Sequence, residues 1–216
     1  MRLGILSDIH GHRKHLKLVK KAMQQHRVDH IYCLGDIFEC KISKKRMSAA
    51  EQFTFADSVV DNDPKLYKHL HQMSCIIGNQ EERIRQLLPL CEFDGEMTHY
   101  LTLPPVIETL DARLEHGHTF LNEQDWRPYP TQMHKHLLFY GHTHESGIYQ
   151  MNMENDRWIP TPIDFTYGTP VQLSPDIYYA INVGAIVNTR PEWLLYEESS
   201  CQITFYQELP IIYKHS

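Results

Sequence analysis

The chain has 216 residues, of which 21 are basic, 27 are acidic and 15 are histidine, and its formal net charge is −6. This charge disfavours a general nucleic-acid binder or an anionic-membrane binder, both of which need a basic surface, but it leaves a small phosphorylated ligand open. The five cysteines have no CxxC spacing, and neither a signal peptide nor a stretch of transmembrane length is found. These features predict a cytoplasmic protein with reduced thiols and no membrane partner.

The first part of the chain alternates between expected strands and expected helices. Short apolar runs predict three strands, at 3–7, 31–34 and 75–77. Apolar residues at helical spacing predict amphipathic helices over 15–27 and 81–88. Residues 43–72 are polar and mostly helical in period, with a break at 62–64. This half therefore follows a βαβαβα pattern.

From about residue 98 the pattern changes to short alternating segments that predict hairpins. They lie at 101–103, 106–110, 113–115, 137–140, 148–151, 178–183, 193–196 and 202–207. Four prolines mark 152–176 as an irregular insertion, and a second insertion is expected near 41–73. Two mixed sheets packed face to face with helices outside satisfy both halves. We therefore expect a single α/β domain over residues 1–216.

Five short motifs place Asp, Asn or His just after apolar runs. They are Asp8-Ile9-His10, Gly35-Asp36, Gly78-Asn79, His116-Gly117-His118 and Gly141-His142-Thr143-His144. Taken singly they are weak, because Gly-Asp and Gly-Asn are common turn dipeptides and a histidine pair fits an exposed strand face. As an ordered set at strand ends, they lie where α/β sheets bind ligands. Carboxylate, imidazole and amide ligands in this number predict two metals bridged by one carboxylate.

The order D-x-H, GD, GN, H, GHxH resembles the calcineurin-like metallophosphoesterase superfamily. The chain length and the stretch Asn182-Val183-Gly184-Ala185 resemble its small bacterial YfcE-type phosphodiesterase branch, which usually has NPGS there. The resemblance implies a four-layer αββα sandwich of two mixed sheets flanked by helices. It also implies two divalent ions, Mn²⁺ first, with Fe, Ni²⁺ or Zn²⁺ as alternatives.

The resemblance assigns the seven motif residues to the two metals. The first metal would be held by Asp8, His10, Asp36 and His144. The second metal would be held by Asp36, Asn79, His116 and His142. Asp36 would bridge them, and a hydroxide between the two metals would attack phosphorus in line.

One position departs from the usual family motif. Many relatives have GNHE or GNHD, whereas this chain has Gly78-Asn79-Gln80-Glu81. Gln80 donates hydrogen bonds but cannot give up a proton, and general acid catalysis is worth about 10² to 10⁴ in rate. We therefore expect substrates with good leaving groups, either phosphodiesters or nucleotide phosphoanhydrides of the dinucleoside polyphosphate type. His12 and His118 are the two candidates to supply a proton, with a supporting hydrogen bond or a solvent-exposed ring as the alternative for each.

Other functions remain open on the sequence. A phosphomonoesterase is an alternative, although residues 35–40 and Gln80 lack the pattern of the Ser/Thr phosphatases. A non-catalytic scaffold on the same fold is another, although no ligand position is lost. The expected partner is a small phosphorylated molecule such as a nucleotide, and a homo-oligomer is left open.

Two further segments have both a functional and a structural interpretation. Trp158, Phe165 and Tyr167 in the second insertion could stack a nucleobase, but packing onto the body of the domain is favoured. The basic cluster at 41–46 could meet phosphate groups, but a solvated helix face is the default expectation.

Overall fold

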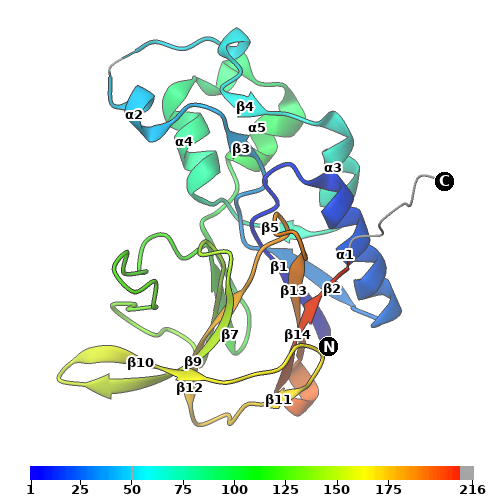
Figure 1. The fold of residues 1–216 in the computed structure, drawn as a ribbon, viewed down its shortest axis with the longest axis vertical. Helices are drawn as coiled ribbons and strands as arrows, with labels where there is room; N and C mark the ends of the chain where they lie inside the picture. Colours follow the sequence, from blue (N-terminus) through cyan, green and yellow to red (C-terminus); the bar gives the residue numbers. More distant parts are fainter. Residues whose placement is uncertain (50, 210–216) are drawn as a thin grey trace.

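The computed structural model describes residues 1–49 and 51–209, which form two six-stranded sheets packed face to face (Figure 1). The strand order is β11-β14-β13-β1-β2-β5 in the first sheet and β10-β9-β12-β8-β7-β6 in the second. A separate two-stranded ribbon pairs β3 (Glu39–Cys40) with β4 (Val60–Asp61). None of the helices within the described ranges has the length and apolar content needed to cross a membrane.

The first sheet has a parallel half and an antiparallel half. Its strands are β1 (Arg2–Leu6), β2 (His30–Cys33), β5 (Ser74–Cys75), β11 (Val171–Gln172), β13 (Glu192–Glu197) and β14 (Gln202–Gln207). Strands β1, β2 and β5 are parallel, and the others are antiparallel to their neighbours. Leu3 and Ile5 pack toward the second sheet, whereas Leu6 packs toward the helices. This alternation follows from the two-residue period of a strand.

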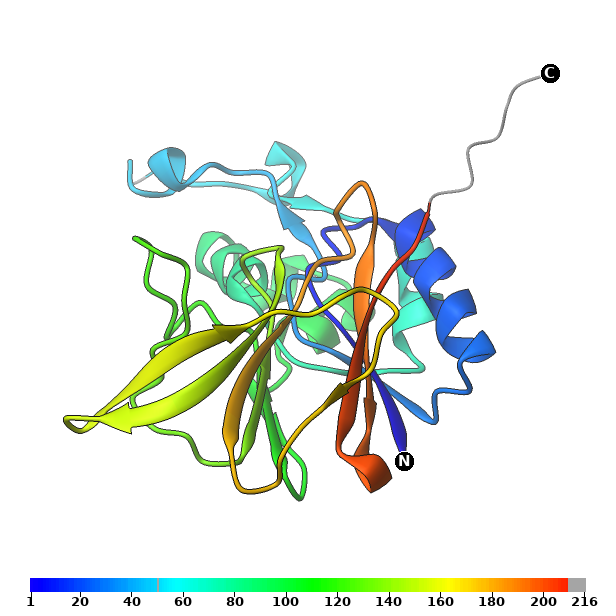
Figure 2. The same ribbon diagram turned by 60° about the horizontal axis from the view of Figure 1, so that its bottom comes forward.

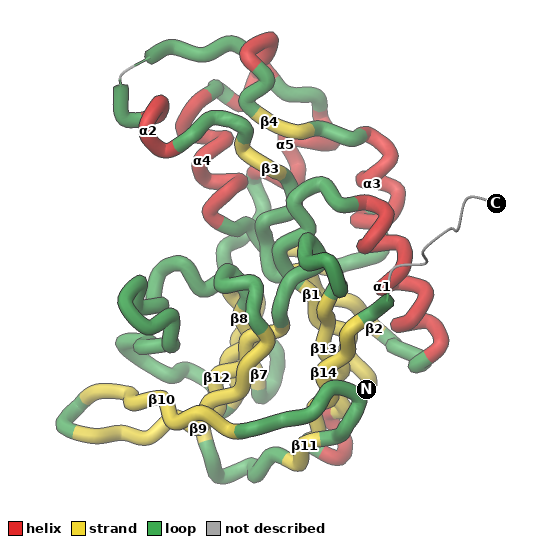
Figure 3. The backbone as a smooth tube through the Cα atoms, viewed as in Figure 1, coloured by secondary structure: helices red, strands yellow, loops and turns green. Residues whose placement is uncertain are grey.

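Helices cover the outer face of the first sheet, except α2, which lies beyond α4 and away from the sheet (Figure 3). The helices are α1 (Arg13–Gln25), α2 (Lys44–Met47), α3 (Pro64–Leu70), α4 (Asn79–Leu87) and α5 (Gly95–Leu101). The expected helices over 15–27 and 81–88 are confirmed within two residues at each end. The expectation for 43–72 is wrong for most of its length, because α3 starts only where the Asp63 side chain caps it and Pro64 fits its first turn. Residues 101–103 are not a strand, contrary to expectation. Leu101 is the last residue of α5, and 102–103 follow the helix.

The second sheet packs its inner face on the first and turns its outer face to a long loop. Its strands are β6 (Val106–Glu108), β7 (Ala112–Glu115), β8 (Leu137–Tyr140), β9 (Ser146–Glu154), β10 (Arg157–Ile163) and β12 (Tyr178–Val183). Strands β7, β8 and β12 are parallel. Phe139 and Ile181 fill the core between the sheets, whereas Tyr140 faces outward against Phe120 and Met133. The expected pair of packed mixed sheets with helices outside is confirmed, with residues 117–135 as a non-helical layer over the second sheet.

Residues 152–176 are irregular only in part, whereas the sequence predicted an irregular insertion. They include the end of β9 and all of β10, which form a long hairpin that extends from the second sheet (Figure 2). Pro160 and Pro162 lie on β10, an edge strand, where a missing N–H interrupts no ladder. Trp158 packs on Tyr178 with ring centroids 4.9 Å apart, and Phe165 packs on Phe205 at 4.1 Å. These two rings therefore attach the segment to the body, which was the favoured interpretation.

Candidate metal centre

The motif residues gather at one edge of the sandwich because the strands that precede them are parallel. Asp8 follows β1, Asp36 follows β2 and Asn79 begins α4 soon after β5. In the second sheet, His116 follows β7 directly, and His142 follows β8. The carboxyl ends of the two parallel sets face each other across the core. Segments more than a hundred residues apart in sequence thus meet at a single site.

Two clusters of ligand-type side chains lie side by side at this edge. One joins Asp8, His10 and His144, and the other joins Asp36, His116 and His142. In the first, His144 Nε2 is 3.3 Å from Asp8 Oδ1 and also 3.3 Å from His10 Nε2. In the second, His116 Nε2 is 3.3 Å from Asp36 Oδ2 and 3.2 Å from His142 Nδ1.

Asp36 lies between the two clusters. Its Oδ2 is 3.3 Å from His116 Nε2 in one cluster and 3.7 Å from His10 Nε2 in the other. Asn79 joins the second cluster, because its Oδ1 is 2.9 Å from His116 Nε2. All seven residues expected to be metal ligands are thus brought together by the fold.

Each aspartate uses one carboxylate oxygen to hold the backbone and turns the other toward the site. Asp8 Oδ2 accepts from the N–H of His142 at 2.9 Å, and Asp36 Oδ1 accepts from the N–H of Gln80 at 2.8 Å. Asp8 Oδ1 is buried and has no hydrogen-bond partner among the residues that the structure describes. An ionised oxygen buried without a donor is costly, so this position calls for a cation.

The imidazoles of two histidines are oriented by acceptors behind them. His10 Nδ1 lies 2.5 Å from Glu39 Oε2, and His116 Nδ1 donates to the carbonyl of Leu34 at 2.8 Å. A proton held on Nδ1 leaves Nε2 with a lone pair that points into the cluster. Such an acceptor behind the ring is the usual support of a metal-binding histidine.

The backbone at the site is strained. Five of the seven residues lie in the left-handed region, which non-glycine residues seldom adopt: Asp8, His10, Asp36, His142 and His144 have φ of 56°, 46°, 50°, 74° and 64°. Each such conformation costs about 1–3 kcal/mol and persists only where the surroundings impose it. The clustering of this strain at one edge is typical of a functional site.

Glycines make room for the two carboxylates. A Cβ on Gly141 would overlap Ser7 Oγ and Asp8 Oδ2, and a Cβ on Gly78 would overlap Asp36 Oδ1. The Gly-Asn and Gly-His dipeptides of the motifs are therefore required by close packing rather than by turn formation alone.

The charges of the clusters shift the pKa values of their members in opposite directions. Burial alone would raise the pKa of Asp8, but the nearby imidazoles of His10 and His144 lower it below its ordinary value. Burial opposes protonation of His10, but Asp8 and Glu39 raise its pKa to about 10. Burial and the neighbouring charge of His116 lower the pKa of His142 to about 4. The carboxylates thus create a negative electrostatic potential at the site, and this potential would also favour the binding of a cation.

These residues fit two divalent cations. The Asp8 oxygen without a hydrogen bond and two pairs of ring nitrogens, each pair 3.2–3.3 Å apart, face the inside of the clusters. Oxygen and imidazole ligands without thiolate suit Mn²⁺, Fe or Zn²⁺. Asp36 Oδ2 is placed to serve both clusters.

Two supporting carboxylates were given no role from the sequence. Glu81 is fully buried, and it accepts from the N–H groups of Asp36, Ile37, Phe38 and Gly78 at 2.8–3.0 Å. Burial and the charge of Asp36 raise its pKa to about 7. A Glu three residues after the residue that precedes an expected helix can accept from that residue's backbone N–H, as Glu81 does from Gly78, and this spacing was the available signal. Glu39 follows Asp36 by three residues without any distinguishing signal.

The three remaining candidates differ in position. Gln80 Oε1 accepts from the N–H of Cys40 and from Arg83 Nη1, both at 3.1 Å, so its carbonyl is committed to holding β3. His12 is an exposed residue that precedes α1 and makes no capping hydrogen bond. His118 is closer to the second cluster, with its ring 5.4 Å from that of His116 and its Nε2 3.2 Å from Glu82 Oε2.

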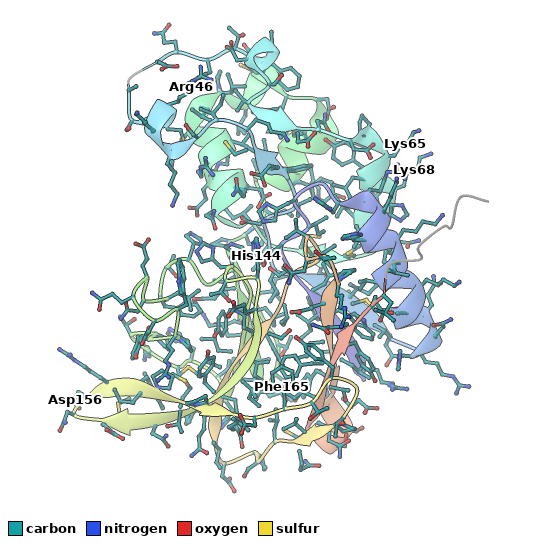
Figure 4. All side chains as sticks on the ribbon, viewed as in Figure 1. Arg46, Lys65, Lys68, His144, Asp156 and Phe165 are labelled. Carbon is teal, nitrogen blue, oxygen red and sulfur yellow. The ribbon has the colours of Figure 1, made fainter. Side chains whose placement is uncertain are left out.

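A cavity of about 370 Å³ adjoins the second cluster. It is lined by His116 and His118 on the side of the site, and by Arg113, Tyr129 and Met133 among others farther away. By contrast, the four basic residues at 41–46 are all exposed, and Arg46 lies far from His144 (Figure 4). Lys41 and Arg46 pair with Asp61 and Glu51, as expected of a solvated face.

A profile of the calcineurin-like phosphoesterase superfamily domain matches residues 1–187. The chain belongs to this superfamily. Membership implies a phosphoester hydrolase that uses divalent metals, and the two clusters are the groups that would hold them. The family resemblance of the motifs is thereby confirmed. No curated protein matches the chain.

The chain is similar to several solved structures. A metallophosphoesterase from Sphaerobacter thermophilus aligns with a TM-score of 0.62 and 21% identity, over 96% of this chain and 88% of that one. A putative diadenosine tetraphosphatase aligns at 0.52 and 14%, over 96% and 93%. The phosphoesterase Yfce of E. coli aligns at 0.48 and 16%, over 92% and 89%.

Proposed function

We propose that the chain is a dinuclear metal-dependent phosphodiesterase or nucleotide phosphoanhydride hydrolase. The position of Asp36 Oδ2 carries the proposal, since it faces His10 of one cluster and His116 of the other at 3.7 and 3.3 Å. Two divalent cations bound there would neutralise charge on the phosphoryl oxygens and lower the pKa of water. The seven residues Asp8, His10, Asp36, Asn79, His116, His142 and His144 would hold them.

The protein groups around the clusters have positioning roles. Glu39 and the Leu34 carbonyl orient the rings of His10 and His116 at their Nδ1 atoms. Glu81 fixes the loop that carries Asp36 through four backbone N–H groups. Ligands held this firmly need little rearrangement when charge develops on the phosphate, which is the main requirement of electrostatic catalysis.

The substrate preference follows from the position after Asn79. Gln80 has no proton to give, and its carbonyl is already committed to Cys40 and Arg83. His118 lies beside the second cluster, so it is better placed than His12 to donate a hydrogen bond to a leaving oxygen. We therefore favour diesters and phosphoanhydrides over alkyl monoesters. A putative diadenosine tetraphosphatase among the structures that share the fold is consistent with a nucleotide substrate.

Two measurements test the function. With Mn²⁺ added, the protein should hydrolyse bis(p-nitrophenyl) phosphate faster than p-nitrophenyl phosphate, and Asp36→Asn should lose both activities. Metal analysis after dialysis should find two ions per chain in the unmodified protein. A preference for the monoester would contradict the argument from Gln80 while keeping the metal centre. Two bound metals without hydrolysis of either ester would favour a scaffold, and fewer than two would contradict the dinuclear site.

A further inference from the structure

Trp126 is an exposed aromatic residue beside the candidate metal centre. Its ring centroid lies 6.3 Å from that of His142, with the two planes at 56°. The side chain nevertheless keeps 49% of its surface exposed, so part of the indole is free for a further contact. An indole that is half-exposed beside a phosphate-binding site offers a flat face on which a second ring can stack.

The loop that carries Trp126 is held in place by its own hydrogen bonds. Trp126 has a φ of 56°, which is unusual for a bulky residue, and its N–H donates to the carbonyl of Asn122 at 2.7 Å. Asp125 accepts from the N–H of Arg127 and from the hydroxyl of Tyr129. A strained residue kept in place by its surroundings indicates a function for that geometry.

Features that could hold a larger substrate are found beside the second cluster. Trp126 is beside His142 of that cluster, and the 370 Å³ cavity adjoins His116 of the same cluster. Tyr129, on the same loop as Trp126, lines the cavity. A substrate bound at the metal centre could therefore extend from the cluster of Asp36, His116 and His142 toward this loop.

We propose that Trp126 is the stacking surface for the nucleobase of a nucleoside phosphoester whose phosphate binds at the metal centre. This proposal rests on the proposed function and narrows its substrate class. A nucleoside phosphoester carries both parts that the site receives, a phosphate and a flat aromatic ring linked to it. Stacking on an indole does not depend on which base is present, so the site selects nucleosides as a class.

The three aromatic rings of the 152–176 segment do not serve this purpose. Trp158 and Phe165 are covered by Tyr178 and Phe205 in the second sheet and the first. Tyr167 donates its hydroxyl to Glu192. The sequence suggested residues 152–176 as the surface for a nucleobase. We infer instead that Trp126, in a segment without any motif, provides it.

Two diesters with the same leaving group test the proposal. They are thymidine 5′-(p-nitrophenyl phosphate) and its abasic counterpart, 1,2-dideoxyribose 5′-(p-nitrophenyl phosphate). Trp126→Ala should lower kcat/KM for the thymidine ester about tenfold, which corresponds to about 1.4 kcal/mol, and leave the abasic ester within twofold. Trp126→Phe should keep most of the preference. Leu110→Ala, at a residue that is 94% exposed, is the control for loss of a surface apolar group.

A binding measurement separates this proposal from the proposed function. Calorimetry with Mn²⁺ compares thymidine 5′-phosphate with deoxyribose 5-phosphate, and Trp126→Ala should weaken only the first, about tenfold. Equal loss for both esters, or no loss for either, would overturn the stacking role while hydrolysis itself stands. If neither ester is hydrolysed, the proposed function fails, and calorimetry alone decides: a Trp126-dependent affinity for the nucleotide supports stacking, and its absence overturns it.

Discussion

Asp8 Oδ2 accepts a hydrogen bond of 2.9 Å from the backbone N–H of His142, which lies 134 positions later in the chain. This bond joins the end of β1 in the first sheet to the end of β8 in the second. The other oxygen, Asp8 Oδ1, faces His144 at 3.3 Å and has no hydrogen bond among the described residues. One side chain therefore both closes the sandwich and supplies a charge to the metal centre.

The two roles of Asp8 separate in the Asp8→Asn variant. The amide oxygen still accepts from His142, but the variant loses the carboxylate charge that His10 and His144 stabilise, so the metal-free variant should be less stable than the metal-free parent at neutral pH. Mn²⁺ at about 100 times its Kd should raise the Tm of the parent by about 5–10 °C and that of the variant much less. Differential scanning calorimetry with and without a chelator measures both effects.

The matched control for Asp8→Asn is Asp156→Asn, in the turn of the β9–β10 hairpin far from His144 (Figure 4). It should keep the full rise in Tm with Mn²⁺. An undiminished rise in Asp8→Asn would show that Asp8 does not hold the metal.

Gly78 and Gly95 give a matched pair of glycine substitutions. A Cβ on Gly78 would overlap the Asp36 carboxylate, whereas a Cβ on Gly95 would meet nothing within 4 Å. Gly78→Ala should cost about 1–3 kcal/mol, a fall of about 3–10 °C in Tm, and should remove hydrolysis because Asp36 is displaced. Gly95→Ala, in the first turn of α5, should gain up to about 1 kcal/mol with full activity. Equal Tm values for the two variants would contradict this packing argument.

Asn182 positions the loop that carries His142 and His144. Its Nδ2 donates to the Gly141 carbonyl at 2.9 Å and to Thr143 Oγ1 at 2.8 Å. Asn182→Ala leaves buried polar groups without partners, each worth about 1–3 kcal/mol, and should weaken Mn²⁺ binding about 10- to 100-fold. Mn²⁺ titration followed by calorimetry measures the loss.

Asn152→Ala is the control for Asn182→Ala, because Asn152 lies half-buried on β9, away from the clusters, and its side chain bonds to Gln150 and Thr161. Its Mn²⁺ affinity should equal that of the parent. Were Asn182→Ala to lose stability with unchanged metal affinity, its role would be limited to packing.

The sequence was sufficient to predict that the seven candidate ligands come together, because each follows a strand that its own apolar run predicts. Asp8 and Asp36 could be placed together once β1 and β2 were expected to be parallel. The roles of Glu39 and Glu81 depend on which backbone and ring nitrogens reach them, and that is set by tertiary packing. Similarly, α5 was missed because its caps and its burial against the first sheet outweigh a short alternating pattern.

The expectation of an irregular insertion at 152–176 is wrong in part, for a different reason. Prolines predict irregular chain, but Pro160 and Pro162 lie on an edge strand, and edge position is a property of the assembled sheet. Trp126 shows the converse. Its segment has no motif and no periodicity, so only the folded structure reveals that its ring lies beside His142.

His118 and His12 were equal candidates for aiding the leaving group, and the structure separates them. The ring of His118 lies 6.1 Å from that of His142 and its side chain is 21% exposed, whereas His12 is exposed ahead of α1. His118→Gln should lower kcat about a hundredfold for diesters with alkyl leaving groups and only slightly for p-nitrophenyl diesters, because only poor leaving groups need a proton donor. His12→Gln should leave both rates close to those of the parent.

A series of diesters with leaving groups of increasing pKa measures this difference as the slope of log kcat against leaving-group pKa. The slope should become steeper in His118→Gln and stay unchanged in His12→Gln. A uniform loss across the series in His118→Gln would assign the residue to packing beside His116 instead. The opposite pattern, with His12→Gln steepening the slope, would place the leaving group on the side of Asp8, His10 and His144 and reverse the direction in which the substrate lies.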